Sequence, residues 1–229
     1  MEWWSWLLYF FLGNWYTWPF LAAIVYGVSS PFLRSFRLWQ AKRRFIRSQG
    51  AKLLNPQNAD ARFQLANIYA EGKSWRRALE YAADAVKVAD ENPLYEGQVP
   101  YHFLRLKGDA QRRLGLYAEA AGTYDRALAA KSDLGHAEAR FGLGVSLQRT
   151  GQLERAFDML NRAIEDNGST LEAYFRLAQV ATDLGRLRER DVVQREFWKV
   201  VATLPRFAGK QRFRWQVAML LFPLTRGIP

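Results

Sequence analysis

The chain has 229 residues, of which 49% are hydrophobic, with 33 lysines and arginines, 22 aspartates and glutamates, and no cysteine. This composition is typical of one or two globular domains and excludes a disordered or low-complexity chain. The lack of cysteine excludes a disulfide framework, a thiolate nucleophile and a cysteine-type zinc site, and two histidines, His102 and His136, leave little room for an imidazole site.

The formal net charge of +11 is distributed unevenly along the chain. Residues 34–52 carry seven bases and no acid, residues 205–229 carry five bases and no acid, and residues 53–204 carry 21 of each. The whole excess of positive charge therefore flanks a neutral body. A nucleic-acid-binding protein would gather its bases on the folded body, so we expect no nucleic-acid partner.

The N-terminal segment, residues 1–36, is rich in aromatic residues and contains a run of 31 residues without charge. A helix needs about 20 apolar residues to cross a bilayer, so this run is long enough to span. We expect residues 19–36 to be the spanning part, with Trp15 and Trp18 at the level of the lipid headgroups. Residues 3–12 could continue the span, lie in the interface or pack on a partner, and the sequence leaves these alternatives open.

The bases that follow this segment predict its orientation. Bases accumulate on the cytoplasmic side of membrane helices, so we expect a single-pass protein with its N-terminus outside and its body in the cytoplasm. Arginine outnumbers lysine 25 to 8, which is typical of a GC-rich bacterium and favours the bacterial inner membrane. The start of the chain has no small-residue cleavage site of the kind that ends a signal peptide. The expected contacts with anionic headgroups are Arg34, Arg37, Arg43 and Arg44.

The body of the chain, residues 59–204, is self-similar, and its last two units start 34 residues apart. Alanine or glycine recurs where two helices of a unit must approach closely, and tyrosine or leucine recurs where neighbouring units meet. The sequence resembles the tetratricopeptide repeat (TPR) family, whose unit is a 34-residue helix–turn–helix. The resemblance implies an all-α solenoid of three to four repeats plus a half-repeat. With the transmembrane helix expected from the uncharged N-terminal run before it and C-terminal helices after it, the whole fold is expected to be all-α. The units are counted from Ala59, Tyr101, Ala137 and Leu171.

The segment before the array continues the family pattern, whereas the last unit departs from it. Residues 37–58, which are basic, are expected to form a juxtamembrane helix that docks on the array as a half-repeat. The fourth unit has Arg190 and Phe197 where the family has small residues, so its second helix is expected to be a terminal cap or to face a partner.

In the TPR family the first helices of the units line a concave groove that receives peptides. Phenylalanine recurs at one position of this surface and arginines gather near its middle, which would suit an apolar peptide with an acidic group. The plainer alternative is that the phenylalanines are interhelical core and the arginines are a solvated face, and the pattern alone slightly favours it. By the resemblance, the groove residues are Phe63, Asn67, Arg105, Arg112, Arg113, Phe141, Arg149 and Phe175.

The C-terminal segment, residues 205–229, is basic at first and then apolar. Its apolar run is too short to span a bilayer as a helix. We expect it to lie in the membrane interface through Arg212, Arg214 and Trp215, and two alternatives are a tail inserted into a partner and a last helix covering the end of the array.

No catalytic motif is complete in the sequence. Gly72-Lys73-Ser74 is like the end of a phosphate-binding loop, but Asn67 stands where that loop needs glycine. We therefore expect no enzymatic activity, no metal and no cofactor. The sequence predicts a membrane-anchored scaffold that binds partner proteins at the cytoplasmic face. The alternative is a permanent accessory subunit of a large integral-membrane complex (respiratory, photosynthetic or secretory) that packs through its aromatic transmembrane segment.

Overall fold

The structure is a computed structural model that describes residues 33, 35–48, 50, 55, 57–95, 98–130, 136–204 and 209–222. Trp15, Trp18, Arg34 and nearly all of the expected membrane-spanning segment lie outside these ranges. Within them, no helix combines the length and the apolar character needed to cross a bilayer.

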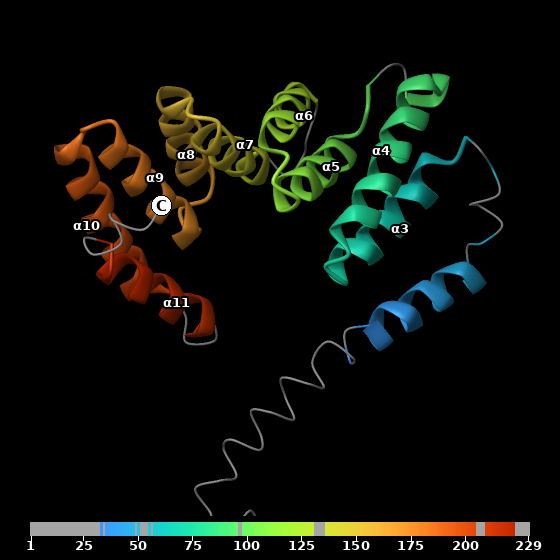
Figure 1. Cartoon of the computed structure of the whole chain (residues 1–229), viewed down its shortest axis with the longest axis horizontal. Coiled ribbons are helices and arrows are strands. Elements are labelled where there is room, and N and C mark those ends of the chain that lie inside the picture. The colour runs from blue at the N-terminus through green and yellow to red at the C-terminus, as the bar shows by residue number, and fades with distance from the viewer. Residues whose placement is uncertain are drawn as a thin grey trace, which may run out of the picture.

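The regular secondary structure of the described residues is entirely helical. Residues 35–48 form a first helix, which is followed by pairs of antiparallel helices that stack side by side into an arc (Figure 1). The elements that follow it are α3 (Ala59–Glu71), α4 (Trp75–Glu91), the short 3-10 helix η2 (Pro93–Tyr95), α5 (Tyr101–Arg113), α6 (Tyr117–Ala129), α7 (Ala137–Arg149), α8 (Leu153–Asp166), α9 (Leu171–Asp183), α10 (Leu187–Thr203) and α11 (Gly209–Leu220).

The turn inside each pair depends on one residue in the left-handed backbone region. Gly115, Gly151 and Gly185 have φ values of 83°, 80° and 74°, and Lys73 takes the equivalent place in the first pair with φ 58°. Glycine adopts this conformation without a steric penalty, so it ends the first helix and reverses the chain within a few residues. The recurring glycine of the sequence therefore sets the hairpin geometry of three pairs.

Small side chains allow the helices of a pair to approach closely. In α4, Ala78, Ala82 and Ala85 are fully buried and lie on one face of the helix against α3 and α5. In the same way, Ala120 and Ala127 of α6 are fully buried. The first helices α3, α5, α7 and α9 also contact one another in sequence, and these contacts form the inner face of the arc.

The helix of residues 35–48 packs on the first pair. Phe45 is buried in one apolar cluster with Leu65 and Tyr69 of α3, and the side chain of Leu38 lies against Gly72. This helix therefore covers the apolar face that α3 would otherwise expose at the start of the array, which is the position proposed for a half-repeat.

The other end of the array is covered by α11. Trp215, Met219 and Phe222 are buried in a cluster with Phe197 of α10 and Tyr174 of α9. The structure thus buries Trp215, which we expected to lie in the membrane interface, in the core of the array, because its ring packs inward on the last pair of helices. Since α11 contacts α9 more extensively than α10, it lies toward the inner face of the arc (Figure 1).

Candidate functional site

The inner face of the arc contains a groove of about 490 Å³. It lies between successive units, and its walls come chiefly from the first helices α3, α5, α7 and α9. The residues that line it are Ala70, Glu71, Trp75, Arg105, Leu106, Asp109, Arg112, Arg113, Ala137, Glu138, Phe141, Ala163, Asn167, Thr170 and Ala173. Charged and aromatic side chains together make up about half of this lining.

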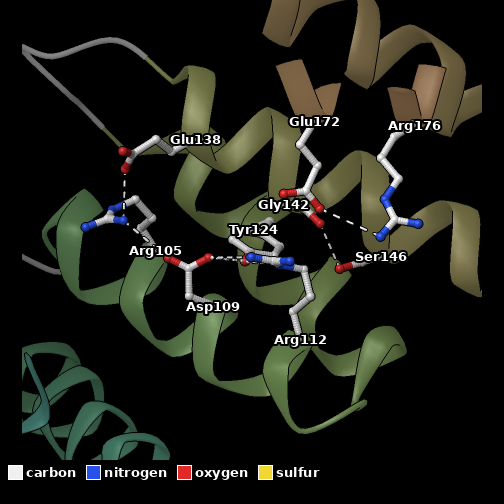
Figure 2. A network of polar contacts seen from close by, with 9 residues as sticks. All are labelled: Arg105, Asp109, Arg112, Tyr124, Glu138, Gly142, Ser146, Glu172 and Arg176. Carbon is white, nitrogen blue, oxygen red and sulfur yellow. Dashed lines mark hydrogen bonds and ion pairs between the residues drawn. The ribbon is translucent and has the colours of Figure 1, made fainter. Parts of the chain in front are cut away.

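The carboxylate of Asp109, which lines the groove, is the centre of a network of polar contacts (Figure 2). The hydroxyl of Tyr124 donates a hydrogen bond of 2.7 Å to it, and the guanidinium of Arg112 lies 3.4 Å from the same oxygen. Arg105, one helical turn earlier on α5, lies 3.2 Å from the second oxygen. Because one carboxylate receives three donors, its charge is neutralised inside the network and is not available to a ligand.

Tyr124 reaches Asp109 from α6 because two glycines leave space for its ring. A Cβ atom added to Gly108 would lie 2.8 Å from the ring, and one added to Gly142 would overlap it more severely. Tyr124 is fully buried, and this burial, together with the neighbouring Asp109 carboxylate, raises the pKa of its phenol far above the ordinary value. The hydroxyl therefore stays protonated and acts as a fixed hydrogen-bond donor between α6 and α5 within the second unit.

Arg105 connects the second unit to the third. Its guanidinium lies 2.8 Å from the carboxylate of Glu138, which stands in the first turn of α7. Together with Asp109, this contact surrounds Arg105 with two acids, so its charge is also compensated within the structure (Figure 2).

Arg112 combines an ion pair with an aromatic contact. Its guanidinium lies 5.8 Å from the ring centre of Phe141. Burial alone would lower the pKa of Arg112, but the oxygens of Tyr124 and Asp109 outweigh burial and raise it, so the guanidinium stays charged. Phe141 therefore presents to the groove an aromatic ring whose neighbour is a positive charge.

Two further arginines on the inner face carry charge that no acid among the described residues compensates. Arg113 lies over the ring of Trp75, with 5.6 Å between the guanidinium carbon and the ring centre, and Arg149 lies 6.0 Å from that of Tyr117. Within the described ranges, neither guanidinium pairs with a carboxylate, and both side chains are exposed. These two groups are available to an acidic ligand.

Arg176 of α9 adds a third cation to this region. Its pKa is lowered chiefly by burial and also by the nearby charges of Arg149 and Arg112, although Glu172 opposes these effects at 3.7 Å. Its Nε atom is buried without a hydrogen-bond partner. Because the positive charges of these arginines repel one another, a negative charge bound on the inner face would be stabilised.

The structure brings together only some of the residues expected at the groove. Arg105, Arg112, Arg113 and Phe141 line it, and Arg149 lies on the same inner face. Within the described residues, Asn67 is partly exposed on α3 and does not line the groove.

Two of the expected phenylalanines pack against their neighbours. Phe63 stacks on Phe103 of α5 with 4.7 Å between ring centres, so it belongs to the contact between the first two units. Phe175 is covered by α11, because its ring lies 5.5 Å from that of Trp215 and 5.7 Å from that of Phe222. Both positions fit the plainer core interpretation, and Phe175 does so because the chain folds back over the fourth unit.

The sequence pattern missed other residues of this surface. Trp75 begins the second helix of its unit and Glu138 is the second residue of α7, so neither lies at the recurring phenylalanine position. Arg176 directly follows Phe175, and a search for bases next to that position would have found it.

The positions expected to face the membrane are distributed over both ends of the array. Arg37, Arg43 and Arg44 are exposed on the helix of residues 35–48, and Arg43 lies 5.1 Å from the ring centre of Trp39. In α11, Arg214 is exposed, and Arg212 stands in the first turn.

The repeat geometry agrees with a comparison against protein-family models. Residues 105–170, which contain the Asp109 network, match the tetratricopeptide repeat model. Over these residues the array is similar to tetratricopeptide repeats. No curated protein matches the sequence significantly.

Solved structures support the same fold for the TPR array. The type IV pilus biogenesis factor PilW is 19% identical with a TM-score of 0.60, and the alignment covers 91% of this chain and 94% of PilW. YrrB, described as a TPR protein with an unusual peptide-binding site, is 21% identical with a TM-score of 0.54, over 80% and 85% of the two chains. MamA from Desulfovibrio magneticus RS-1 is 16% identical with a TM-score of 0.57, over 79% and 93%. At these identities the likeness establishes the solenoid fold.

Proposed function

We propose that this chain is a membrane-anchored, non-enzymatic TPR scaffold that binds a segment of a partner protein in its inner groove. The observation that carries the proposal is a pair of exposed guanidiniums, Arg113 in the lining of the groove and Arg149 on the same inner face, neither of which pairs with a carboxylate of the described residues. The peptide-binding site named for YrrB supports this use of a TPR surface.

The chemistry of the groove favours a partner segment with one acidic group and one apolar side chain. The acid would meet Arg113 or Arg149, because the other groove arginines already contact Asp109 or Glu138. The apolar side chain would meet Phe141 and Trp75, which line the same groove. A guanidinium can form two parallel hydrogen bonds with a carboxylate, which gives such a contact its orientation.

The test is photo-crosslinking from the groove in the native membrane. A photoreactive amino acid replaces Glu71, which lines the groove and is exposed on α3, and a control replaces Arg162, which is exposed on α8. We expect specific protein adducts from position 71 that are absent from position 162. The same adducts from both positions, or none from position 71, would contradict groove binding.

The membrane part of the proposal rests on the sequence of residues 1–36. We propose that residues 19–36 span the inner membrane, with the repeats on the cytoplasmic side, because of the uncharged run and the bases after it. Its test is extraction of membranes with alkaline carbonate, together with protease access from the outer side. Release of the chain by carbonate would contradict the anchor, and cleavage of the repeats from outside would contradict the orientation.

A second candidate function is favoured by the aromatic density of the N-terminal segment. Five of the nine tryptophans lie within the first 18 residues, which is more than an anchor requires and would suit packing on partner helices in a permanent membrane complex. Replacement of residues 1–33 by a polyleucine span separates the two functions. A scaffold keeps its groove adducts after the exchange, whereas a packed subunit is lost from its complex.

A further inference from the structure

The two ends of the described array, residues 33–48 and 213–221, carry most of its exposed apolar side chains. Of the thirteen large hydrophobic residues that are exposed in the described ranges, seven lie in residues 33–48 and 213–221. The other six are scattered along 94–198. Single exposed apolar residues are ordinary on a soluble surface, but a concentration on two short helices marks an interaction surface.

In α11, the exposed apolar side chains lie on the face opposite the core. Trp215 and Met219 face the last pair of helices, whereas Phe213 and Leu220, which are 68% and 66% exposed, stand two helical turns apart on the other face. Leu221, just after the helix, is 45% exposed. The helix is therefore apolar on two sides, and only one of them is covered by the array.

The helix of residues 35–48 has the same two-sided character. Phe45 and Leu38 face α3, whereas Phe36, Trp39 and Ile46 are 45%, 50% and 47% exposed. Arg43 lies against the ring of Trp39 within this exposed stripe. The stripe combines aromatic rings and guanidiniums, which are the groups that occupy the headgroup region of a bilayer.

The charge of both helices identifies the partner. Residues 35–48 contain five bases and no acid, and α11 contains three bases and no acid, whereas the repeats between them are neutral. Most protein surfaces carry both acids and bases, so helices that dock on a protein are expected to carry both as well. Helices that carry bases and no acid match a surface of uniformly negative charge. Anionic lipid headgroups form such a surface.

We propose that the exposed faces of α11 and of the helix of residues 35–48 dock on an anionic membrane surface and hold both ends of the array to it. The length of α11, 12 residues, allows it to lie in the interface and is too short for a span. Both helices lie on the concave side of the arc, one at each end (Figure 1). Docking would therefore hold the groove close to the membrane, where segments of integral membrane proteins emerge.

The absence of cysteine from the chain makes a clean test possible. Leu220→Cys and Ile46→Cys, each in the full chain, are labelled with an environment-sensitive fluorophore. Gly122→Cys serves as the matched control, because Gly122 is exposed on α6 and a Cβ there meets no atom within 4 Å. Each protein is reconstituted with phosphatidylcholine vesicles, with or without phosphatidylglycerol.

We expect the labels at positions 220 and 46 to shift to a blue emission and to be protected from an aqueous quencher only on the vesicles that contain phosphatidylglycerol. The shift should be reversed by high salt, since each base contributes about fivefold to binding at low salt. The label at position 122 should stay in water throughout.

A label at position 220 that stays in water on anionic vesicles would overturn the proposal, whatever the label at position 46 does. That result is expected if the exposed face of α11 docks on a protein instead. Co-sedimentation of the chain with both kinds of vesicle reports separately on the N-terminal anchor. The groove adducts from position 71 report separately on partner binding. Failure of the anchor or of groove binding can therefore be distinguished from failure of the two end helices to dock on the membrane.

Discussion

The hydroxyl of Tyr124 lies 2.7 Å from the carboxylate of Asp109, on a different helix, and donates a hydrogen bond to it. The contact joins α6 to α5 directly beneath the groove, and the ring of Tyr124 also fills the space beside Gly142 of α7. A single side chain therefore connects three helices of two units. The position of Arg112, which contacts both Tyr124 and Asp109, depends on this arrangement.

Replacement of Tyr124 by phenylalanine should lower the free energy of unfolding by about 1–2 kcal/mol. The ring remains, but the partly buried Asp109 carboxylate loses its shortest hydrogen bond and keeps only the contacts with Arg112 and Arg105, and the loss of a hydrogen bond to a charged group costs about this amount. Urea unfolding measures the effect. Tyr95→Phe is the control, because the Tyr95 hydroxyl donates to Asp60 at the surface, and we expect less than about 0.5 kcal/mol from its loss. Equal costs for the two variants would contradict the role given to Tyr124.

The raised pKa of Tyr124 predicts a loss of stability in alkali. The folded phenol keeps a proton that the unfolded chain releases above about pH 10, so the contribution is fully present below that pH. As pH rises further, the free energy of unfolding should fall by about 1.4 kcal/mol per pH unit from this residue alone. Urea unfolding between pH 9 and pH 11 (roughly one unit on either side of that value) should show a shallower fall for Tyr124→Phe. An unchanged slope would contradict the burial of this phenol.

Substitution of the two glycines on either side of Tyr124 should be costly, and Gly142 offers the sharper test. A Cβ at Gly142 would overlap the tyrosine ring, and such overpacking costs about 1–3 kcal/mol, which exceeds the helix propensity gained from alanine. Gly122→Ala should instead stabilise by about 0.5–1 kcal/mol, because its Cβ meets nothing. Thermal unfolding of both variants measures the difference. A stabilised Gly142→Ala would show that the ring does not fill this space.

The repeat fold could be predicted from the sequence because it depends on local spacing. Small residues such as Ala82 and Gly108 recur in register with the turn glycines, and this spacing determines how the two helices of a pair meet. The start of each unit follows from the same register.

Parts of the site could not be predicted because they depend on contacts between distant segments. Phe175 occupies the same position in its unit as Phe141, yet α11 folds back and covers it. Nothing in the periodicity of α9 encodes that contact. Likewise, Trp215 is buried because its side of α11 meets α9. The sequence of α11 has apolar residues on both sides, so it does not indicate which side packs on the array.

The apolar cluster of α9, α10 and α11 is expected to stabilise the C-terminal end of the array. Phe197 is fully buried at the junction of α9, α10 and α11, whereas its neighbour Trp198 is 37% exposed. Phe197→Ala should cost about 3–5 kcal/mol, and Trp198→Ala less than about 1 kcal/mol. Hydrogen exchange should show that the loss begins in α10 and α11, because contacts in a solenoid are mostly between neighbours. Uniform loss of protection along the whole array would contradict this view.

Arg113 and Arg149 of the inner face are proposed to bind the partner, and quantitative capture of that partner tests this role most directly. The full chain, solubilised in mild detergent, is compared with Arg113→Glu/Arg149→Glu and with the control Arg188→Glu/Arg195→Glu, whose charges lie exposed on α10. The two double variants have the same net charge. We predict that the control recovers the same partner as the unchanged chain, and that the groove variant loses it by at least about tenfold, as expected from two lost charge-assisted contacts. Equal recovery by both variants would contradict the claim.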